Sequence, residues 1–234
     1  MTSLKNFKDK LFQFCLELAW KHWTKLGISG RERAAEKVNP DPEALILLIG
    51  FLGNKDLRLL ENVVTWLVTN ESLLHKPRLK TVLNVDDLTT LKVLSRIFKR
   101  TKELGRKSKW DSLEEYCTKR ADGMKGATGR ADLNLSQAND ISRDVRADIG
   151  NNRLLFRKLF GTNTRAELLN FFFCGGSGSS KGIAEYLQLS QSTVHKTLGE
   201  LVDIGLLTQK GRSRNTSYRM VEGYLSLEGA QKLT

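Results

Sequence analysis

Two short helix patterns separated by a turn of three residues constrain the fold of this chain more than any other feature of its sequence. The patterns cover residues 180–187 and 191–204, and Gly205 ends the second one, as glycine commonly does at helix C-termini. In both, apolar residues recur every three or four positions, so each helix has one face that must be buried. The short turn places these two faces against each other. The preceding helix pattern opens with Thr164 and Glu167 at the spacing of a capping box and continues as LLNFFF.

Two strand-like runs follow the second short helix. They are Leu206–Lys210 and Thr216–Met220, and the residues between them, GRSRN, are typical of a hairpin turn. The predicted order of elements is a helix, a glycine-rich loop, a short helix, a turn, a second helix and a hairpin. This is the order of a helix-turn-helix that is followed by a wing. We therefore predict a winged helix-turn-helix domain with a small β-hairpin wing over residues 153–222.

The second short helix has a polar face once its apolar face is buried. Packing of Val194, Leu198 and Leu201 on the first short helix turns the intervening polar residues away from the core. An α-helix fits the DNA major groove, where short polar side chains near its N-terminus reach base edges, and the helix N-terminus itself attracts phosphate. The alternative is a face that is merely solvated and a turn whose arginines only keep it soluble. The expected DNA-binding residues are Ser190, Gln191, Ser192, Thr193, His195 and Lys196 on the helix, with Lys210, Arg212 and Arg214 on the wing.

About a quarter of the chain resembles the winged-helix domains of MarR- and ArsR-like bacterial transcriptional regulators. The resemblance is carried by Ile183–Ala184, Ser190, Ser192–Val194, Leu198, Leu201, Gly205–Leu206 and Tyr218–Arg219. It implies sequence-specific binding to double-stranded DNA. The metal sites of ArsR-type regulators need clusters of Cys or His that this sequence lacks, so metal sensing is not implied. The run NNRLLFRKLFGTNTRAELLNFF is also similar to the entry of such domains in regulators and in antitoxin-like proteins encoded beside nucleotidyltransferase genes.

Helix patterns also fill residues 1–120, so we predict a mainly α protein with an N-terminal helical domain that dimerises or receives a signal. The apolar run of residues 44–52 has no polar side and predicts a central buried helix. Trp20 and Trp23 are expected in the core or in a dimer interface. An amphipathic first helix carries one apolar stripe, which consists of Leu4, Phe7, Leu11, Phe14 and Leu18. From Phe7 onward, this stripe and Trp20 or Trp23 are the candidates for a self-complementary two-fold interface of the homodimer.

The pattern weakens between the two domains. Residues 121–152 are predicted to be a linker with one loose helix around residues 138–149, because they hold several glycines and few large apolar residues. Residues 223–234 are predicted to be a C-terminal tail.

The charge of the chain favours a nucleic-acid partner. Lys and Arg total 38 against 26 Asp and Glu, which leaves a net charge of +12. Residues 92–130 hold 12 basic and five acidic residues, residues 150–234 hold 11 and six, and the rest of the chain is balanced. Such a confined excess is expected of a protein that binds nucleic acid. The run KRTKELGRKSK, residues 99–109, is either a second phosphate-binding patch or an ordinary charged helix end.

Several function classes are disfavoured by the sequence. Three widely spaced cysteines, Cys15, Cys117 and Cys174, argue against disulfides and suit the reducing cytoplasm. We find no signal-peptide pattern, no membrane-spanning run, no metal-ligand spacing and no catalytic motif, so we expect a cytoplasmic protein without membrane contact, cofactor or metal that is not an enzyme.

The sequence therefore predicts a transcriptional regulator, most simply a repressor, that binds double-stranded DNA as a homodimer, because one short helix reads too few base pairs. The alternative is a protein-interaction or antitoxin-like component whose winged helix mainly holds a partner protein, such as a toxin.

Overall fold

The computed structural model describes residues 2–29, 39–105, 110–124, 151–211 and 216–221. The protein is mainly helical, with one small antiparallel sheet of two strands near the C-terminus of the described chain, as the sequence predicts. The chain divides into two compact units, Met1–Asn151 (unit 1) and Asn152–Thr234 (unit 2). Among the described residues, no helix is long and apolar enough to cross a membrane.

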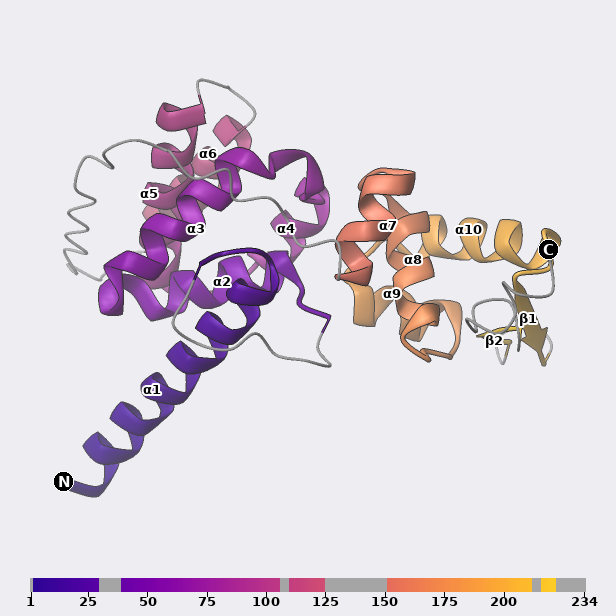
Figure 1. Cartoon of the computed structure of the whole chain (residues 1–234), viewed down its shortest axis with the longest axis horizontal. Coiled ribbons are helices and arrows are strands. Elements are labelled where there is room, and N and C mark those ends of the chain that lie inside the picture. Colours follow the sequence, from indigo (N-terminus) through magenta and orange to yellow (C-terminus); the bar gives the residue numbers. More distant parts are fainter. Residues whose placement is uncertain (1, 30–38, 106–109, 125–150, 212–215, 222–234) are drawn as a thin grey trace. The chain divides into compact units, whose positions relative to one another are not determined.

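Unit 1 is a helical assembly (Figure 1) in which three other helices pack on α5. Its core includes the fully buried side chains of Trp23, Trp66 and Trp110. Helix α5 packs on α2, α3 and α6, and Gly50 of α2 lets it approach closely, because an added Cβ there would lie 2.6 Å from Leu94. The elements of unit 1 are α1 (Thr2–Lys25), α2 (Pro42–Leu52), η1 (Gly53–Lys55), α3 (Leu57–Thr69), η2 (Glu71–Leu73), α4 (Lys76–Val82), α5 (Leu88–Gly105) and α6 (Asp111–Gly123).

A buried ion-pair cluster joins the start of α2 to α4. Arg78 donates hydrogen bonds to Asp41 and to Glu43, the latter over 2.8 Å, and Glu43 is completely buried. The second carboxylate oxygen of Glu43 accepts a hydrogen bond from the backbone N–H of His75 (2.8 Å). Because a buried charge needs both a counter-charge and hydrogen bonds, these contacts hold the two helices in register.

The prediction that residues 44–52 form a helix buried on all sides is wrong for one face. Leu45, Ile46 and Ile49 are buried, but Ala44 and Phe51 are exposed. Leu47 and Leu48 are only half-buried, so this face of α2 is partly open to solvent, although Phe51 at its end stacks on Phe12 of α1.

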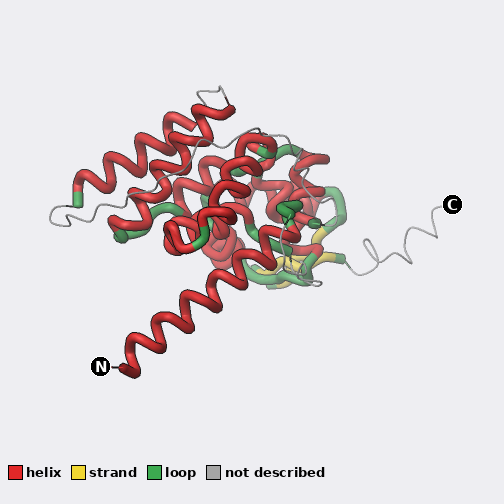
Figure 2. The backbone as a smooth tube through the Cα atoms, turned by 60° about the vertical axis from the view of Figure 1, so that its left-hand side comes forward, coloured by secondary structure: helices red, strands yellow, loops and turns green. Residues whose placement is uncertain are grey.

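Helix α1 packs on the rest of unit 1 through its C-terminal half, whereas its N-terminal half projects away from it. Trp23 is in the core, where it packs edge-on against Trp66, and Trp20 donates a hydrogen bond from its indole N–H to Asp56 (2.8 Å). The N-terminal half of α1 extends away from the other helices of unit 1 in both views (Figures 1 and 2). Every described side chain from Leu4 to Leu11 is exposed.

Unit 2 has its own apolar core, which α8, α9, α10 and the hairpin share. Leu168 and Leu169 of α8, Leu187 of α9 and Leu201 of α10 meet there, closed on the hairpin side by Tyr218. The elements are α7 (Asn152–Phe160), α8 (Thr164–Phe173), α9 (Ser180–Leu187), α10 (Gln191–Asp203), β1 (Leu207–Lys210) and β2 (Ser217–Met220).

The predicted capping box at the start of α8 is wrong. The N-cap is Asn163, whose side-chain oxygen accepts a hydrogen bond from the backbone N–H of Ala166 (3.1 Å). Glu167 is completely buried and pairs instead with Arg157 of α7 (2.5 Å). A carboxylate held this way ties α7 to α8 and cannot reach back to the helix terminus.

Most of the predicted linker, its loose helix and the C-terminal tail lie outside the described residues. Helix α6 continues to Gly123, three residues beyond the boundary that the sequence predicted for the N-terminal domain.

Candidate nucleic-acid interface

The turn between α9 and α10 sets how these helices meet. Gln188 has φ 55° and ψ 46°, the left-handed conformation that ends many helices. Its backbone N–H donates to the carbonyl of Glu185 (3.2 Å), and the N–H of Leu189 donates to the carbonyl of Ala184 (2.9 Å). The chain thus reverses within three residues, and α10 begins at Gln191.

One face of α10 is buried in unit 2. Val194, Leu198 and Leu201 are at most 2% exposed and share a cluster with Ile183 and Leu187 of α9. These are the positions that the apolar period of the sequence predicted, so the opposite face of α10 is the one directed to solvent.

The six residues predicted to contact DNA from this helix are all exposed in unit 2. They form the polar N-terminal part of α10 and its N-cap, and they are Ser190, Gln191, Ser192, Thr193, His195 and Lys196. Ser190 occupies the N-cap position, but its hydroxyl makes no cap hydrogen bond and lies 2.9 Å from the hydroxyl of Ser192. The helix start therefore presents two neighbouring hydroxyls at its positive dipole end.

The hairpin carries cations on one side. Lys210 pairs with Ser217 and Thr208 with Arg219 in the β1–β2 register. Because side chains alternate along a strand, Lys210 and Arg219 share the outer face, whereas Tyr218 points into the core. Arg212 and Arg214, the other predicted wing residues, lie outside the described residues.

Arg219 is a candidate that the predicted set of site residues omitted. Its signal is visible in the sequence, because a buried Tyr218 places its neighbour on the outer face of a strand. Among the residues that the structure describes, Lys196, Lys210 and Arg219 have no carboxylate partner. By contrast, Lys181 lies 3.9 Å from Glu185, and Arg165 lies 2.8 Å from Glu200.

The glycine-rich loop before α9 is attached to the hairpin. Gly178 forms an antiparallel bridge with Tyr218, in which the two backbone N–H groups donate over 3.1 and 2.9 Å. Gly178 has φ 151°, a conformation that side chains rarely adopt. The sequence predicted only a loop here, because a glycine and serine run has no alternation of polar and apolar residues. The bridge anchors strand β2 to the loop that leads into α9.

The basic run of unit 1 is largely neutralised where it is described. Lys102 lies against Asp111 and Glu114, and the hydrogen bond from Lys102 to Asp111 raises the pKa of this lysine. Arg100 pairs with Glu103 (3.2 Å). Arg106, Lys107 and Lys109, the other cations of this run, lie outside the described residues, so both interpretations of the run stay open.

A metal site and a reactive Cys117 thiol have little support in the described residues. No group of three His, Cys, Asp or Glu side chains comes together there in a way that could hold a metal ion. Burial raises the pKa of the Cys117 thiol to about 12, so this thiol is protonated near neutral pH and is a poor nucleophile.

Compared with models of protein families, with curated proteins and with solved structures, the chain gives no match.

Proposed function

We propose that unit 2 is a winged helix-turn-helix domain and that the protein is a sequence-specific regulator that binds double-stranded DNA. The observation that carries the proposal is α10. It follows a three-residue turn, buries Val194, Leu198 and Leu201, and exposes an unbroken polar face from its first residue. A helix of this kind is what the major groove admits.

In this proposal, the short polar side chains at the start of α10 and the cations of α10 and the hairpin contribute differently to DNA binding. Gln191 and Thr193 contact base edges and give sequence preference, whereas Lys196, Lys210 and Arg219 contact phosphates and give affinity. Arg212 and Arg214 add phosphate or minor-groove contacts from the wing. Repression by occlusion of a promoter is the simplest regulatory result.

A second candidate function, the holding of a partner protein, is favoured by an aromatic surface on α7 and α8. Phe156 stacks on Phe160 (ring centroids 6.3 Å apart) and meets Phe173 edge-on (5.6 Å). Phe160 is 46% and Leu159 64% exposed. Exposed apolar residues gathered in this way are typical of protein interfaces, and a toxin-like partner would bind here rather than on α10.

Selection of bound sequences from random duplex DNA, followed by titration of the full chain at several salt concentrations, tests the proposal. Binding to the selected duplex should fall steeply with salt, because phosphate contacts release counterions. In the double variant Lys196→Ala, Lys210→Ala, the slope of log K against log salt should become shallower by about one unit for each phosphate that the protein no longer touches.

Lys119→Ala is the matched control, because Lys119 is an exposed lysine of unit 1 that pairs with Glu115. Its slope should equal that of the unmodified chain. If no duplex is enriched, or if the double variant and the control give the same slope, the DNA-binding function is wrong and the partner-protein function becomes the better candidate.

A further inference from the structure

Unit 1 holds an exposed apolar helix face that its own fold does not use. The stripe of α1 (Leu4, Phe7, Leu11, Phe14 and Leu18) is between 37% and 63% exposed. At 3.6 residues per turn, this stripe lies on the side of α1 away from Ala19 and Trp23, which face the core. Folding of unit 1 therefore leaves the stripe open to solvent.

The first turns of α1 need a partner to be stable. A helical segment of about ten residues is marginal in water by itself, and helices in proteins are stabilised mainly by packing of an apolar face. Every described side chain from Leu4 to Leu11 is exposed, and both views show this part of α1 projecting beyond the other helices of unit 1 (Figures 1 and 2).

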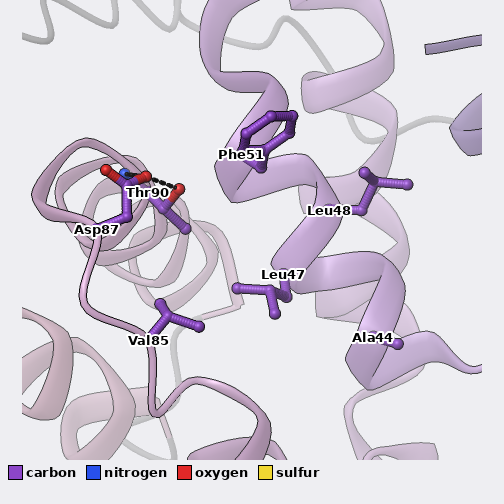
Figure 3. Close-up of a pocket in the computed structure, with 7 residues that line it drawn as sticks. All are labelled: Ala44, Leu47, Leu48, Phe51, Val85, Asp87 and Thr90. Atoms are coloured by element: carbon purple, nitrogen blue, oxygen red, sulfur yellow. Dashed lines mark hydrogen bonds between the residues drawn. The ribbon is translucent and has the colours of Figure 1, made fainter. Parts of the chain in front are cut away.

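Unit 1 also holds an apolar groove. It has a volume of about 420 Å³ and lies between α2 and the segment that leads into α5. Leu47 and Val85 point into the space between these elements (Figure 3). The α2 side of the groove consists of Ala44, Leu47, Leu48 and Phe51, which recur at helical spacing along one face.

The stripe and the groove match in length and in charge. Leu4 to Leu11 and Ala44 to Phe51 each cover eight residues, and the seven steps from first to last span roughly 10 Å of helix. Lys8 and Lys10 flank the stripe, and the exposed Asp87 lines the groove. Two apolar helix faces of equal length pack as ridges and grooves, with the charges paired at their edges.

Helix α1 cannot fill the groove of its own copy. It is one continuous helix from Thr2 to Lys25, and Phe12 on its other side stacks on Phe51 at 5.2 Å. That contact places α1 beside its own groove with the stripe directed elsewhere. A second copy can supply the missing helix.

We propose that two copies of the chain exchange α1, so that Leu4, Phe7 and Leu11 of each copy occupy the α2–α5 groove of the other. The contact is reciprocal, so it closes as a two-fold dimer. The stripe exposes roughly 500 Å² of apolar surface, taking about 150–250 Å² for each aromatic side chain and less for each leucine. Only Leu4, Phe7 and Leu11 enter the groove, so the two reciprocal contacts, with the surfaces they cover, bury roughly 1,200 Å², the lower end of the range of stable specific interfaces.

Analytical ultracentrifugation of the full chain and two single variants tests the exchange. Phe7→Glu places a charge on the stripe, and Ala44→Glu places one in the groove. Both residues are exposed, so neither change disturbs the core. Each variant should raise the dimer dissociation constant by about tenfold or more. Asn6→Glu, which adds the same charge on another face of α1, should leave the dimer intact.

A mixture of the two variants separates exchange from other dimers. The heterodimer keeps one intact pair, the stripe of the Ala44→Glu chain in the groove of the Phe7→Glu chain, so mixing should restore part of the dimer. The proposal is wrong if the unmodified chain is monomeric, if only Phe7→Glu dissociates it, or if the mixture stays as monomeric as either variant. These outcomes concern unit 1 and are independent of whether unit 2 binds DNA.

Discussion

Helix α1 of unit 1 and helix α10 of unit 2 both present a face to solvent, and the two faces expose opposite chemistry. Helix α1 exposes phenylalanines and leucines at helical spacing, whereas α10 exposes serine, threonine, glutamine, histidine and lysine. Apolar side chains gain free energy when another apolar surface covers them, but polar side chains need a partner that replaces their hydrogen bonds with water. This contrast is the reason why we propose a protein partner for α1 and a hydrated, charged ligand for α10.

The interiors of the two units are held in a similar way. Each has one completely buried glutamate paired with an arginine, Glu43 with Arg78 in unit 1 and Glu167 with Arg157 in unit 2. The difference between the units therefore lies in what their surfaces expose, and it can be tested separately in each. All four tryptophans belong to unit 1, so tryptophan fluorescence reports on that unit alone.

The largest effect is expected from Glu167→Ala. It leaves Arg157 buried without its counter-charge, which should lower the free energy of unfolding of unit 2 by about 3–5 kcal/mol. Denaturant unfolding followed by circular dichroism should show a transition at lower denaturant, while tryptophan fluorescence stays unchanged.

Glu200→Ala is the control, because its pair with Arg165 is exposed and should contribute less than about 1 kcal/mol. If fluorescence and circular dichroism move together in Glu167→Ala, the two units do not unfold separately and the comparison between them fails.

A smaller effect is expected on the polar face of α10. Gln191→Ala or Thr193→Ala should weaken binding to the selected duplex by about 1–3 kcal/mol, with little change on random DNA, because these side chains would no longer reach base edges. Fluorescence anisotropy with both duplexes measures this. Thr164→Ala at the start of α8 makes the same change away from the face and should have no effect. Equal weakening on both duplexes would mean that these side chains contact only phosphate.

The N-cap residue Asp56 of α3 should contribute more to stability than the N-cap residue Ser190 of α10. The carboxylate of Asp56 in unit 1 accepts hydrogen bonds from the N–H of Leu59 (2.9 Å) and from Trp20 (2.8 Å). Asp56→Ala should cost about 1–2 kcal/mol of stability, measured by tryptophan fluorescence. Ser190→Ala in unit 2 should change stability little, because the Ser190 hydroxyl makes no cap bond. A larger loss for Ser190→Ala than for Asp56→Ala would contradict this assignment.

The smallest effect concerns pH. Partial burial lowers the pKa of His22 below its usual 6.5, so the folded state of unit 1 favours the neutral ring. As the pH falls below 6.5, the unfolded state binds more protons, and unit 1 should lose stability. His22→Gln should reduce that pH dependence in tryptophan fluorescence, and an identical pH profile for both proteins would show that His22 does not contribute.

The local parts of the fold could be predicted from the sequence. The helix expected at residues 180–187 has those bounds in the structure, and the one expected at residues 191–204 ends one residue earlier. Val194, Leu198 and Leu201 are buried as predicted, because the period of apolar residues defines one helix face. The same local information placed six of the nine expected DNA-binding residues on an exposed helix surface.

Long-range contacts could not be predicted. Gly178 bridges to Tyr218, 40 positions later, although its own surroundings resemble a plain loop. One face of α2 stays open to solvent although all of its residues are apolar. Periodicity shows which faces of a helix are apolar, but the number of helices that cover those faces depends on segments elsewhere in the chain.

The sequence by itself determined the helical class, the two short helices around a tight turn, the polar face of α10 and the apolar stripe of α1, since each depends on residues a few positions apart. Only the tertiary structure decided the roles of Glu43 and Glu167. A glutamate in the first turn of a helix can cap that helix in water or pair with an arginine in the core. Arg78 is 35 positions from Glu43, and Arg157 is 10 from Glu167. Whether an arginine lies beside the glutamate depends on how the helices pack. Once the carboxylate is buried, the ion pair is needed to stabilise its charge.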